Sequence, residues 1–329
     1  MTADTAMRAL ERIDAETPFE RVLLGPTFLD EPLKEHPVTR FLVLRGLVGT
    51  FDITSMADEP SPEHEQSREA RRLLAGSLAQ TGDGELKIAP DDRDGWKFTP
   101  DLLHTGEKTA LVDYDCMNSV ASRLRDLLSP DHRSLKLWEI TAMLVGNPAV
   151  ERELFRGCYD ELCRYVELAH TIGNFSLIPY TRNGPSKGYN HEKGCTYEDR
   201  EDKFLQRLHD EWDSDELTWE TEEGSCPCRD VMSFERYVKV AQLELYCVPD
   251  KVVETFLTAT KGEKDDRAVV AAYESVVERR CGAPVDFGEG DLSYLRGATP
   301  RILARGRLVM ARFHLAPPTM TVAPNPPTA

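Results

Sequence analysis

The stretch that decides the fold is LAHTIGNFSLIPYTRNGPSKGYNHEKG, residues Leu168–Gly194. It leaves an amphipathic segment, turns at residues 171–174 and enters a short apolar run. Gly173 stands where a left-handed residue would end a helix, since glycine adopts that conformation at the least cost. The run closed by Pro179 has the length and composition of a short strand. The stretch therefore predicts a helix, a turn and a strand in succession, followed by a polar loop.

Upstream of this turn the sequence predicts a long helix, from about Pro148 to Ala169. Its apolar side chains recur at the spacing of a buried helical stripe. They are Phe155, Cys158, Tyr159, Leu162, Val166 and Ala169. Near the N-terminus, Arg40–Thr54 is rich in β-branched and apolar residues, which predicts one or two strands. A further short strand is expected at Leu86–Ile88.

Amphipathic spacing predicts helices over much of the remaining chain, and Ser67 is the expected N-cap of one of them. The predicted helices cover 1–16, 67–80, 110–129, 134–147, 198–212, 233–247, 250–260, 265–282 and 299–314. The acidic residues after 212, up to Glu223, are expected to form a solvated loop. The predicted fold is therefore α+β and predominantly α-helical, with a small N-terminal strand element. We expect one globular domain over 1–315, with 55–100 as the place for a subdivision, and a disordered proline-rich tail over 316–329.

Charge and hydropathy exclude several classes of function. The 329 residues carry a net charge of −17, which disfavours broad, non-specific binding to nucleic acid or to an anionic membrane. No apolar run approaches the length of a membrane-spanning helix, and the N-terminal residues lack the apolar core of a secretion signal. We therefore expect a cytoplasmic protein with reduced cysteines. Phosphate-loop, dinucleotide-binding and nucleophile-elbow motifs do not occur in the sequence.

The polar loop after the strand is the first candidate site. Side chains with hydrogen-bonding groups are concentrated there: Asn183, Lys187, Asn190, His191 and Lys193. A binding or catalytic loop would explain this density, and so would a solvated connection. Asp199 and Asp202 follow at a predicted helix start, where the helix dipole alone favours acidic residues. Arg200 between them could form an ion cluster, which would contribute little at an exposed position.

One resemblance covers roughly residues 170–212. The string HTIGNFSLIP, followed by Asn190, Gly194 and DREDKFLQRL, resembles a family of uncharacterised bacterial proteins. That family carries a T-I-G-x-x-x-x-x-P turn, an asparagine-and-glycine loop and a D-R-x-D-x-x-L helix start. The matching positions are Thr171, Ile172, Gly173, Pro179, Asn190, Gly194, Asp199, Arg200, Asp202 and Leu205. The resemblance implies a fold and a bacterial origin, and it brings no established activity.

A second resemblance is shorter and more specific chemically. GNFSLIPYTRN is similar to a segment of His-Asn-His nucleases of type IV restriction systems, with Asn174 and Asn183 matching asparagines and Lys193 the closing lysine. In that family a histidine activates water and a divalent ion stabilises the developing charge. The family's histidine lies upstream in an H-I-x-P-type motif. Here the upstream histidines are His132 and His170, which lack that context.

Metal binding has a further candidate in Cys226 and Cys228, with His191 and Cys195 earlier in the chain. Zinc needs four nitrogen or sulfur ligands, usually from two short pairs. The C-x-C spacing is tighter than the usual pair, and the alternative is two exposed thiols in an acidic loop.

Arginines of the C-terminal helix form a stripe of Arg301, Arg305 and Arg312, with Arg307 nearby. They could bind an anion or a nucleic-acid backbone. We expect them instead to pair with acidic elements of the same chain, of which 198–223 is the richest.

The leading hypothesis is an uncharacterised soluble intracellular bacterial protein with a binding site in 170–203. The alternatives are a divergent metal-dependent nuclease, which alone would require a divalent metal, and a non-catalytic adaptor. The catalytic candidates are His170, Asn174 and His191. The binding candidates are Asn183, Lys187, Asn190, Lys193, Asp199, Arg200 and Asp202.

Overall fold

The structure is a computed structural model of the whole chain, and parts of the chain are described in it. The described residues are 14–17, 36–42, 62–78, 80, 87–89, 101–116, 123–124, 127–128, 135, 137–147, 150–169, 171–179, 200–277, 280 and 282–316. Most of the first predicted helix, residues 43–54 of the predicted N-terminal strands and the tail from 317 lie outside them.

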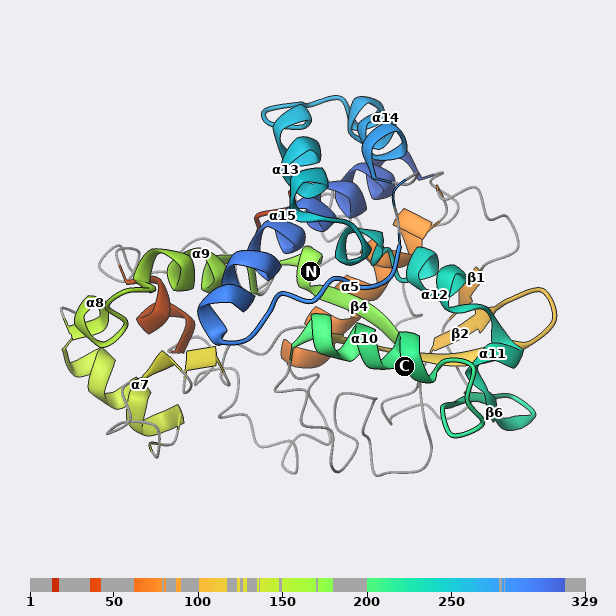
Figure 1. The fold of residues 1–329 in the computed structure, drawn as a ribbon, viewed down its shortest axis with the longest axis horizontal. Coiled ribbons are helices and arrows are strands. Elements are labelled where there is room, and N and C mark those ends of the chain that lie inside the picture. Colours follow the sequence, from red (N-terminus) through yellow and green to blue (C-terminus); the bar gives the residue numbers. More distant parts are fainter. Residues whose placement is uncertain are drawn as a thin grey trace, which may run out of the picture.

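Helices dominate the described residues, and a small antiparallel sheet accompanies them (Figure 1). This confirms the predicted α+β, mostly helical class. The helices are α5 (Pro62–Leu78), α7 (Leu137–Gly146), α8 (Glu151–Leu154), α9 (Tyr159–Ala169), α10 (Glu201–Glu211), α11 (Cys228–Val231), α12 (Phe234–Val240), α13 (Asp250–Ala259), α14 (Asp266–Val276) and α15 (Asp291–Leu315), with 3-10 turns η5 (Ile172–Asn174) and η7 (Glu244–Cys247). None of the described helices is long and apolar enough to cross a membrane.

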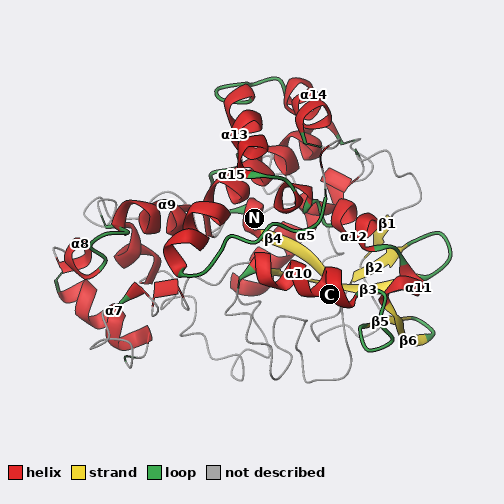
Figure 2. Ribbon diagram, viewed as in Figure 1, coloured by secondary structure: helices red, strands yellow, loops and turns green. Residues whose placement is uncertain are grey.

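Among the described residues the sheet has six strands, five of them in the order β1-β2-β3-β5-β6, and β4 also pairs with β3. The strands are β1 (Lys87–Ala89), β2 (Asp101–His104), β3 (Thr109–Cys116), β4 (Phe175–Pro179), β5 (Thr218–Thr221) and β6 (Gly224–Pro227). Cys116 pairs with Phe175 and Val112 with Pro179, so β3 connects the early strands to the strand after the turn. Figure 2 shows the strands together, with α7 and α8 at the opposite end of the molecule.

Several sequence predictions of local structure were wrong. Thr109–Cys116 is a strand, although 110–129 was expected to be helical. It pairs with three strands, β2, β4 and β5, and that pairing outweighs the helical pattern of the leucines that follow. Residues Arg40–Leu42, expected to begin a strand, are helical. Helix α5 begins at Pro62, so Ser67 lies inside it and is not its N-cap.

The predicted long helix before the turn is two helices. Gly157 has φ +95° and separates α8 from α9. The predicted buried stripe is nonetheless correct for Phe155, Cys158 and Leu162. The stripe residues on both sides of the break still face the core. Their burial was therefore predictable from the sequence, although the break itself was not.

The acidic segment after α10 is also more ordered than the sequence suggested. Residues 218–227 form the β5–β6 hairpin, and Trp219 and Glu220 are buried in it. The predicted helix 233–247 ends at Val240, and Gln242 has φ +55° before η7 begins. The predicted strand after the turn, helix α10 with its buried Phe204 and helix α13 are confirmed. The last two helices are also present, but α14 ends at Val276 rather than at 282, and α15 begins at Asp291 rather than at 299.

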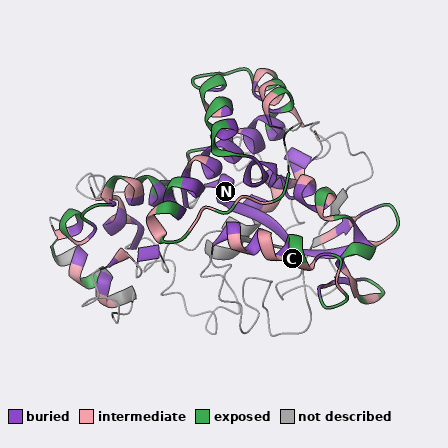
Figure 3. Ribbon diagram, viewed as in Figure 1, coloured by how far each residue is buried: buried purple, intermediate pink, exposed green. Residues whose placement is uncertain are grey.

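Helix α15 runs through the centre of the described structure, and Figure 3 shows it buried along most of its length. The buried side chains form three hydrophobic clusters, and each contains residues of α15. Val309 and Phe313 belong to the cluster of the sheet and α5. Ile302 packs with α7 and α9, and Leu308 packs with α13 and α14. Helix α15 thus contributes side chains to all three of these clusters.

Candidate functional site

Three of the ten predicted site residues fall within the described structure: Asn174, Arg200 and Asp202. Asn174 ends η5, and the other two lie at the start of α10. The remaining candidates lie outside the described residues: His170, Asn183, Lys187, Asn190, His191, Lys193 and Asp199. Their predicted catalytic and binding roles remain predictions.

Asn174 is fully buried and terminates the preceding helix. Its Nδ2 donates to the Ala169 carbonyl at 2.7 Å, and its backbone N–H donates to the Thr171 carbonyl at 3.0 Å. The last carbonyls of a helix lack partners within the helix, so this side chain satisfies one of them. The Thr171 hydroxyl does the same for Leu168 at 2.8 Å. The polar residues of the turn therefore support the end of α9.

Gly173 is needed for a reason that the sequence did not reveal. It lies in η5 and is not among the residues with positive φ, so the predicted left-handed helix end is wrong. A Cβ atom at this position would lie 1.9 Å from the Ile302 carbonyl oxygen and 3.0 Å from the Gly306 nitrogen. The turn lies directly against the backbone of α15, and only a residue without a side chain permits that approach.

Arg305 of α15 also contacts the turn, through hydrogen bonds to its backbone. Its guanidinium is fully buried and donates to backbone carbonyls of two segments. The distances are 2.9 Å to Gly173 O, 2.8 Å to Gln242 O and 2.8 Å to Ala241 O, and Phe175 O is a further acceptor. Burial lowers the pKa of Arg305, with the charge of Glu201 among the opposing effects. This guanidinium joins the turn and β4 to the segment before η7.

The predicted arginine stripe is therefore internal. Arg301, Arg305 and Arg312 are all buried. Arg301 donates to Leu245 O at 3.0 Å and Val248 O at 2.8 Å, and it pairs with Asp250. The expectation that the stripe binds within its own chain agrees with this geometry. The expected partner was wrong, because the hydrogen bonds go to carbonyls and to Asp250 rather than to the acidic segment 198–223.

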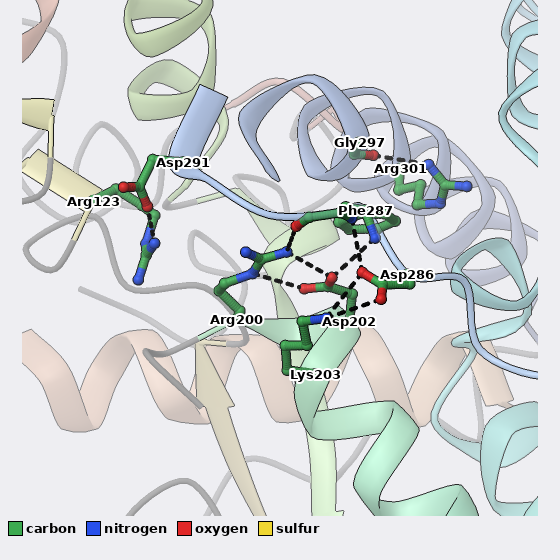
Figure 4. A network of polar contacts seen from close by, with 10 residues as sticks. Arg123, Arg200, Asp202, Lys203, Asp286, Phe287, Asp291, Gly297 and Arg301 are labelled. Atoms are coloured by element: carbon green, nitrogen blue, oxygen red, sulfur yellow. Dashed lines mark hydrogen bonds and ion pairs between the residues drawn. The ribbon is translucent and has the colours of Figure 1, made fainter. Parts of the chain in front are cut away.

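Arg200 and Asp202 form a buried bidentate ion pair at the start of α10 (Figure 4). Arg200 Nε donates to Asp202 Oδ1 at 3.1 Å and Nη2 donates to Oδ2 at 2.8 Å. Arg200 also donates to Gly288 O, and the Phe287 N–H donates to Asp202 Oδ2 at 3.0 Å. The two side chains are 4% and 1% exposed, so the predicted surface location was wrong. Paired charges of this kind fix the start of α10 against the segment before α15.

Lys203 and Asp286 extend the network toward the solvent (Figure 4). Lys203 Nζ lies 3.0 Å from both carboxylate oxygens of Asp286, and the Gly288 N–H donates to Oδ1 at 2.7 Å. The Lys203 hydrogen bond, followed by that of the Gly288 amide, lowers the pKa of Asp286. Since Asp286 is half-exposed, this pair contributes little compared with its buried neighbour.

Tyr294 lies beneath the network, between two arginines. The Arg200 guanidinium is 4.9 Å from the centre of its ring and that of Arg123 is 5.5 Å away. Arg123 is buried and pairs with Asp291 at the start of α15. Sequence analysis did not find Arg123, Asp286, Asp291 or Tyr294, because no periodic or motif signal links positions separated by 80 to 170 residues.

Glu201 lies on the inner side of the same helix start and is buried. Burial raises the pKa of Tyr237 well above its usual value, and the charge of Glu201 is the next largest cause. The Tyr237 hydroxyl donates to Leu177 O of β4 at 3.1 Å. Buried side chains therefore link β4, which precedes residues 180–199, to α10, which follows them.

The zinc hypothesis gains no ligand set from the described residues. Neither Cys226 nor Cys228 forms a disulfide within the described part of the chain. Cys226 is half-buried and Cys228 is buried, so the expectation of two exposed thiols was wrong. Within the described part of the chain, no group of three His, Cys, Asp or Glu side chains is arranged to hold a metal ion. His191 and Cys195 lie outside it.

Comparison with protein-family models, with curated proteins and with solved structures gave no match for this chain.

Proposed function

We propose that this chain is a cytoplasmic, non-catalytic binding protein of bacterial origin whose ligand is contacted by the segment between β4 and α10. The observation that supports the proposal is the hydrogen bonding of Arg200 and Asp202. Their side chains bind each other, and both also bind backbone groups of residues 287–288. Groups bound in this way fix a scaffold and are poorly suited to transferring protons.

Asn174 supports the binding role over the nuclease. Its amide already donates to the Ala169 carbonyl in the protein interior, which gives it a helix-capping task. The two ends of the segment, Pro179 and Arg200, are both buried and anchored. Anchored ends reduce the entropy lost when a connecting segment is ordered around a ligand.

The composition of residues 181–194, the larger part of this segment, favours a small anion as the ligand. These residues contain Arg182, Lys187 and Lys193 against Glu192, so three positive charges less one negative give +2, and Glu198 and Asp199 follow them at the end of the segment. The chain as a whole carries −17. Asn183 and Asn190 add amide donors that suit phosphate or carboxylate oxygens. A small anion satisfies these groups, whereas a long polyanion would be repelled by the remaining surface.

Thermal stability in the presence of defined anions tests the proposal. Inorganic phosphate, citrate and adenosine monophosphate are added separately to the full chain, and the melting temperature is followed. Binding to the folded state alone stabilises by RT ln(1 + [L]/Kd), about 2.7 kcal/mol at one hundred times Kd. The double variant Lys187→Gln, Lys193→Gln should lose the shift.

The matched control is the double variant Lys251→Gln, Lys261→Gln, which removes the same charge from exposed positions of the α13 region. It should keep the full shift. Equal loss in both variants, or no shift with any of the three anions, contradicts the proposal. Cleavage of DNA or RNA that requires magnesium and stops with chelator would establish the nuclease instead.

A further inference from the structure

A second buried polar cluster lies far along the chain from the proposed binding segment, where η7, α14 and α15 meet. Glu244 is 5% exposed and its Oε1 accepts a hydrogen bond from the Tyr273 hydroxyl at 2.6 Å. Arg312 places its guanidinium 4.6 Å from the centre of the Tyr273 ring and donates to Gln242 Oε1 at 3.1 Å. The cluster thus connects three elements through one tyrosine.

The carboxyl group of Glu244 is poorly prepared to carry a charge. Its Oε2 is buried and has no hydrogen-bond partner among the described residues. The ion pairs of the described chain do not include Glu244, so no cation lies within 4.0 Å of it there. An ionised carboxylate removed from water needs several donors or a close cation, and this one has the Tyr273 phenol and the backbone N–H of Glu244 itself.

Two arginines oppose this effect from α15. Arg312 and Arg305 both favour the ionised form, and the Tyr273 hydrogen bond adds to them. Both guanidiniums also donate to neutral acceptors. Arg305 is bound to backbone carbonyls, and Arg312 is bound to Gln242, which in turn donates to Ser77 Oγ of α5 at 2.5 Å. The nearby Arg301 is paired with Asp250. Burial is the largest effect, and the pKa of Glu244 is raised.

The position of this carboxyl group gives its charge a mechanical consequence. Helices α13 and α14 form a hairpin that packs on α15 in a hydrophobic cluster of its own (Figure 1). Tyr273 belongs to that cluster and reaches η7 through Glu244. Water drawn toward a charged Glu244 has to enter where α14 meets the rest of the protein.

We propose that Glu244 is a proton-binding switch that sets how firmly the α13–α14 hairpin is held on α15. With a proton bound, the carboxyl group is neutral and the junction is closed. With the proton lost, Oε2 carries charge in a buried place, and opening of the hairpin hydrates it.

The sign of the pH dependence follows from the raised pKa. The closed form binds the proton more tightly than an opened form in which Glu244 meets water. The junction is therefore most stable at low pH. Its stability falls as the pH rises from the usual pKa of a glutamate to the raised pKa of the closed form, and above that raised pKa its stability stays constant. Over that window the opening equilibrium increases tenfold for each pH unit.

Hydrogen exchange of the hairpin amides in the full chain tests the switch. Exchange is compared between the protein and its Glu244→Gln variant from about pH 5 to about pH 8, so that the intrinsic pH dependence of exchange cancels at each pH. The ratio of the rate in the protein to the rate in the variant should rise with pH. Glu274→Gln on the exposed side of α14 is the matched control and should give a ratio near unity throughout.

The Tyr273→Phe variant provides a second, independent arm. It removes the donor to the carboxylate and keeps the ring, so hairpin exchange at high pH should become faster still. A Glu244→Gln variant that exchanges faster than the protein at every pH, or that fails to fold, would show that the ionised carboxylate stabilises the junction and would overturn the proposal. A ratio that does not change with pH would overturn it as well.

Discussion

Substitution of Gly173 by alanine tests how closely the turn approaches α15. The added Cβ would lie 1.9 Å from the Ile302 carbonyl oxygen and 2.9 Å from its carbon. Both atoms belong to the backbone of a buried helix, so they cannot move aside as a flexible side chain would. The substitution therefore forces a displacement of the turn or of the helix.

The expected loss in the free energy of unfolding lies at the upper end of the usual range for overpacking. An added methyl group in a packed core costs roughly 1–3 kcal/mol, and because the obstacle here is backbone we expect about 3 kcal/mol or more. For a chain of 329 residues the unfolding entropy is about 0.7 kcal/mol/K, so about 3 kcal/mol corresponds to a fall in melting temperature of roughly 4 °C. Displacement of the turn should also lengthen the hydrogen bonds that Arg305 donates to it. Chemical denaturation and calorimetry measure the change in the free energy of unfolding.

Two other glycines separate steric crowding from backbone strain. Gly262 has φ +72° and open space around it, so alanine there reports only conformational strain, about 1 kcal/mol. At Gly306 a Cβ would lie 3.2 Å from Ala15, and the better helix propensity of alanine offsets that tight contact by about 1 kcal/mol. We expect Gly173→Ala to be the most costly of the three. A change at Gly173 no larger than that at Gly262 would refute the close approach.

Other substitutions address the buried charges. Arg305→Met should cost about 3–5 kcal/mol by leaving several buried carbonyls without donors, whereas Arg307→Met, which removes a half-buried arginine from the same helix, should cost about 1 kcal/mol; urea denaturation of both variants measures the difference. Asp202→Asn should cost about 3–5 kcal/mol because it leaves the buried Arg200 guanidinium without a counter-charge, and Asp286→Asn at the exposed end of the same network should cost less than about 1 kcal/mol. Equal losses for the two aspartates would show that the Arg200 pair is hydrated rather than buried.

Local pattern predicted much of the secondary structure but little of the site. Helix α10, with Phe204 and Leu208 facing inward, was predictable because amphipathic spacing depends on neighbours in the sequence. The strand Thr109–Cys116 was missed because two of its three partner strands, β4 and β5, lie far along the chain and begin only at residues 175 and 218. The break at Gly157 was missed because the apolar stripe continues across it.

The candidate site shows the same limit more strongly. Arg200 and Asp202 were binding candidates in the sequence, but their burial depends on Phe287 and Gly288, some 85 residues later. The arginines of α15 were expected to pair with acidic residues of the same chain, because charged residues are rarely buried unpaired. Most of the acceptors of Arg301 and Arg305 are backbone carbonyls, which no side-chain pattern records.

The central position of α15 has a consequence for biosynthesis. Every other described element precedes residues 291–315 in the chain, yet each of the three hydrophobic clusters uses side chains from that helix. While the chain is being translated, the sheet, the α9 region and the α13–α14 hairpin all expose the surfaces that α15 will later cover. The nascent chain therefore cannot bury these three apolar surfaces until its last described helix has left the ribosome, and exposed apolar surface of this kind favours aggregation.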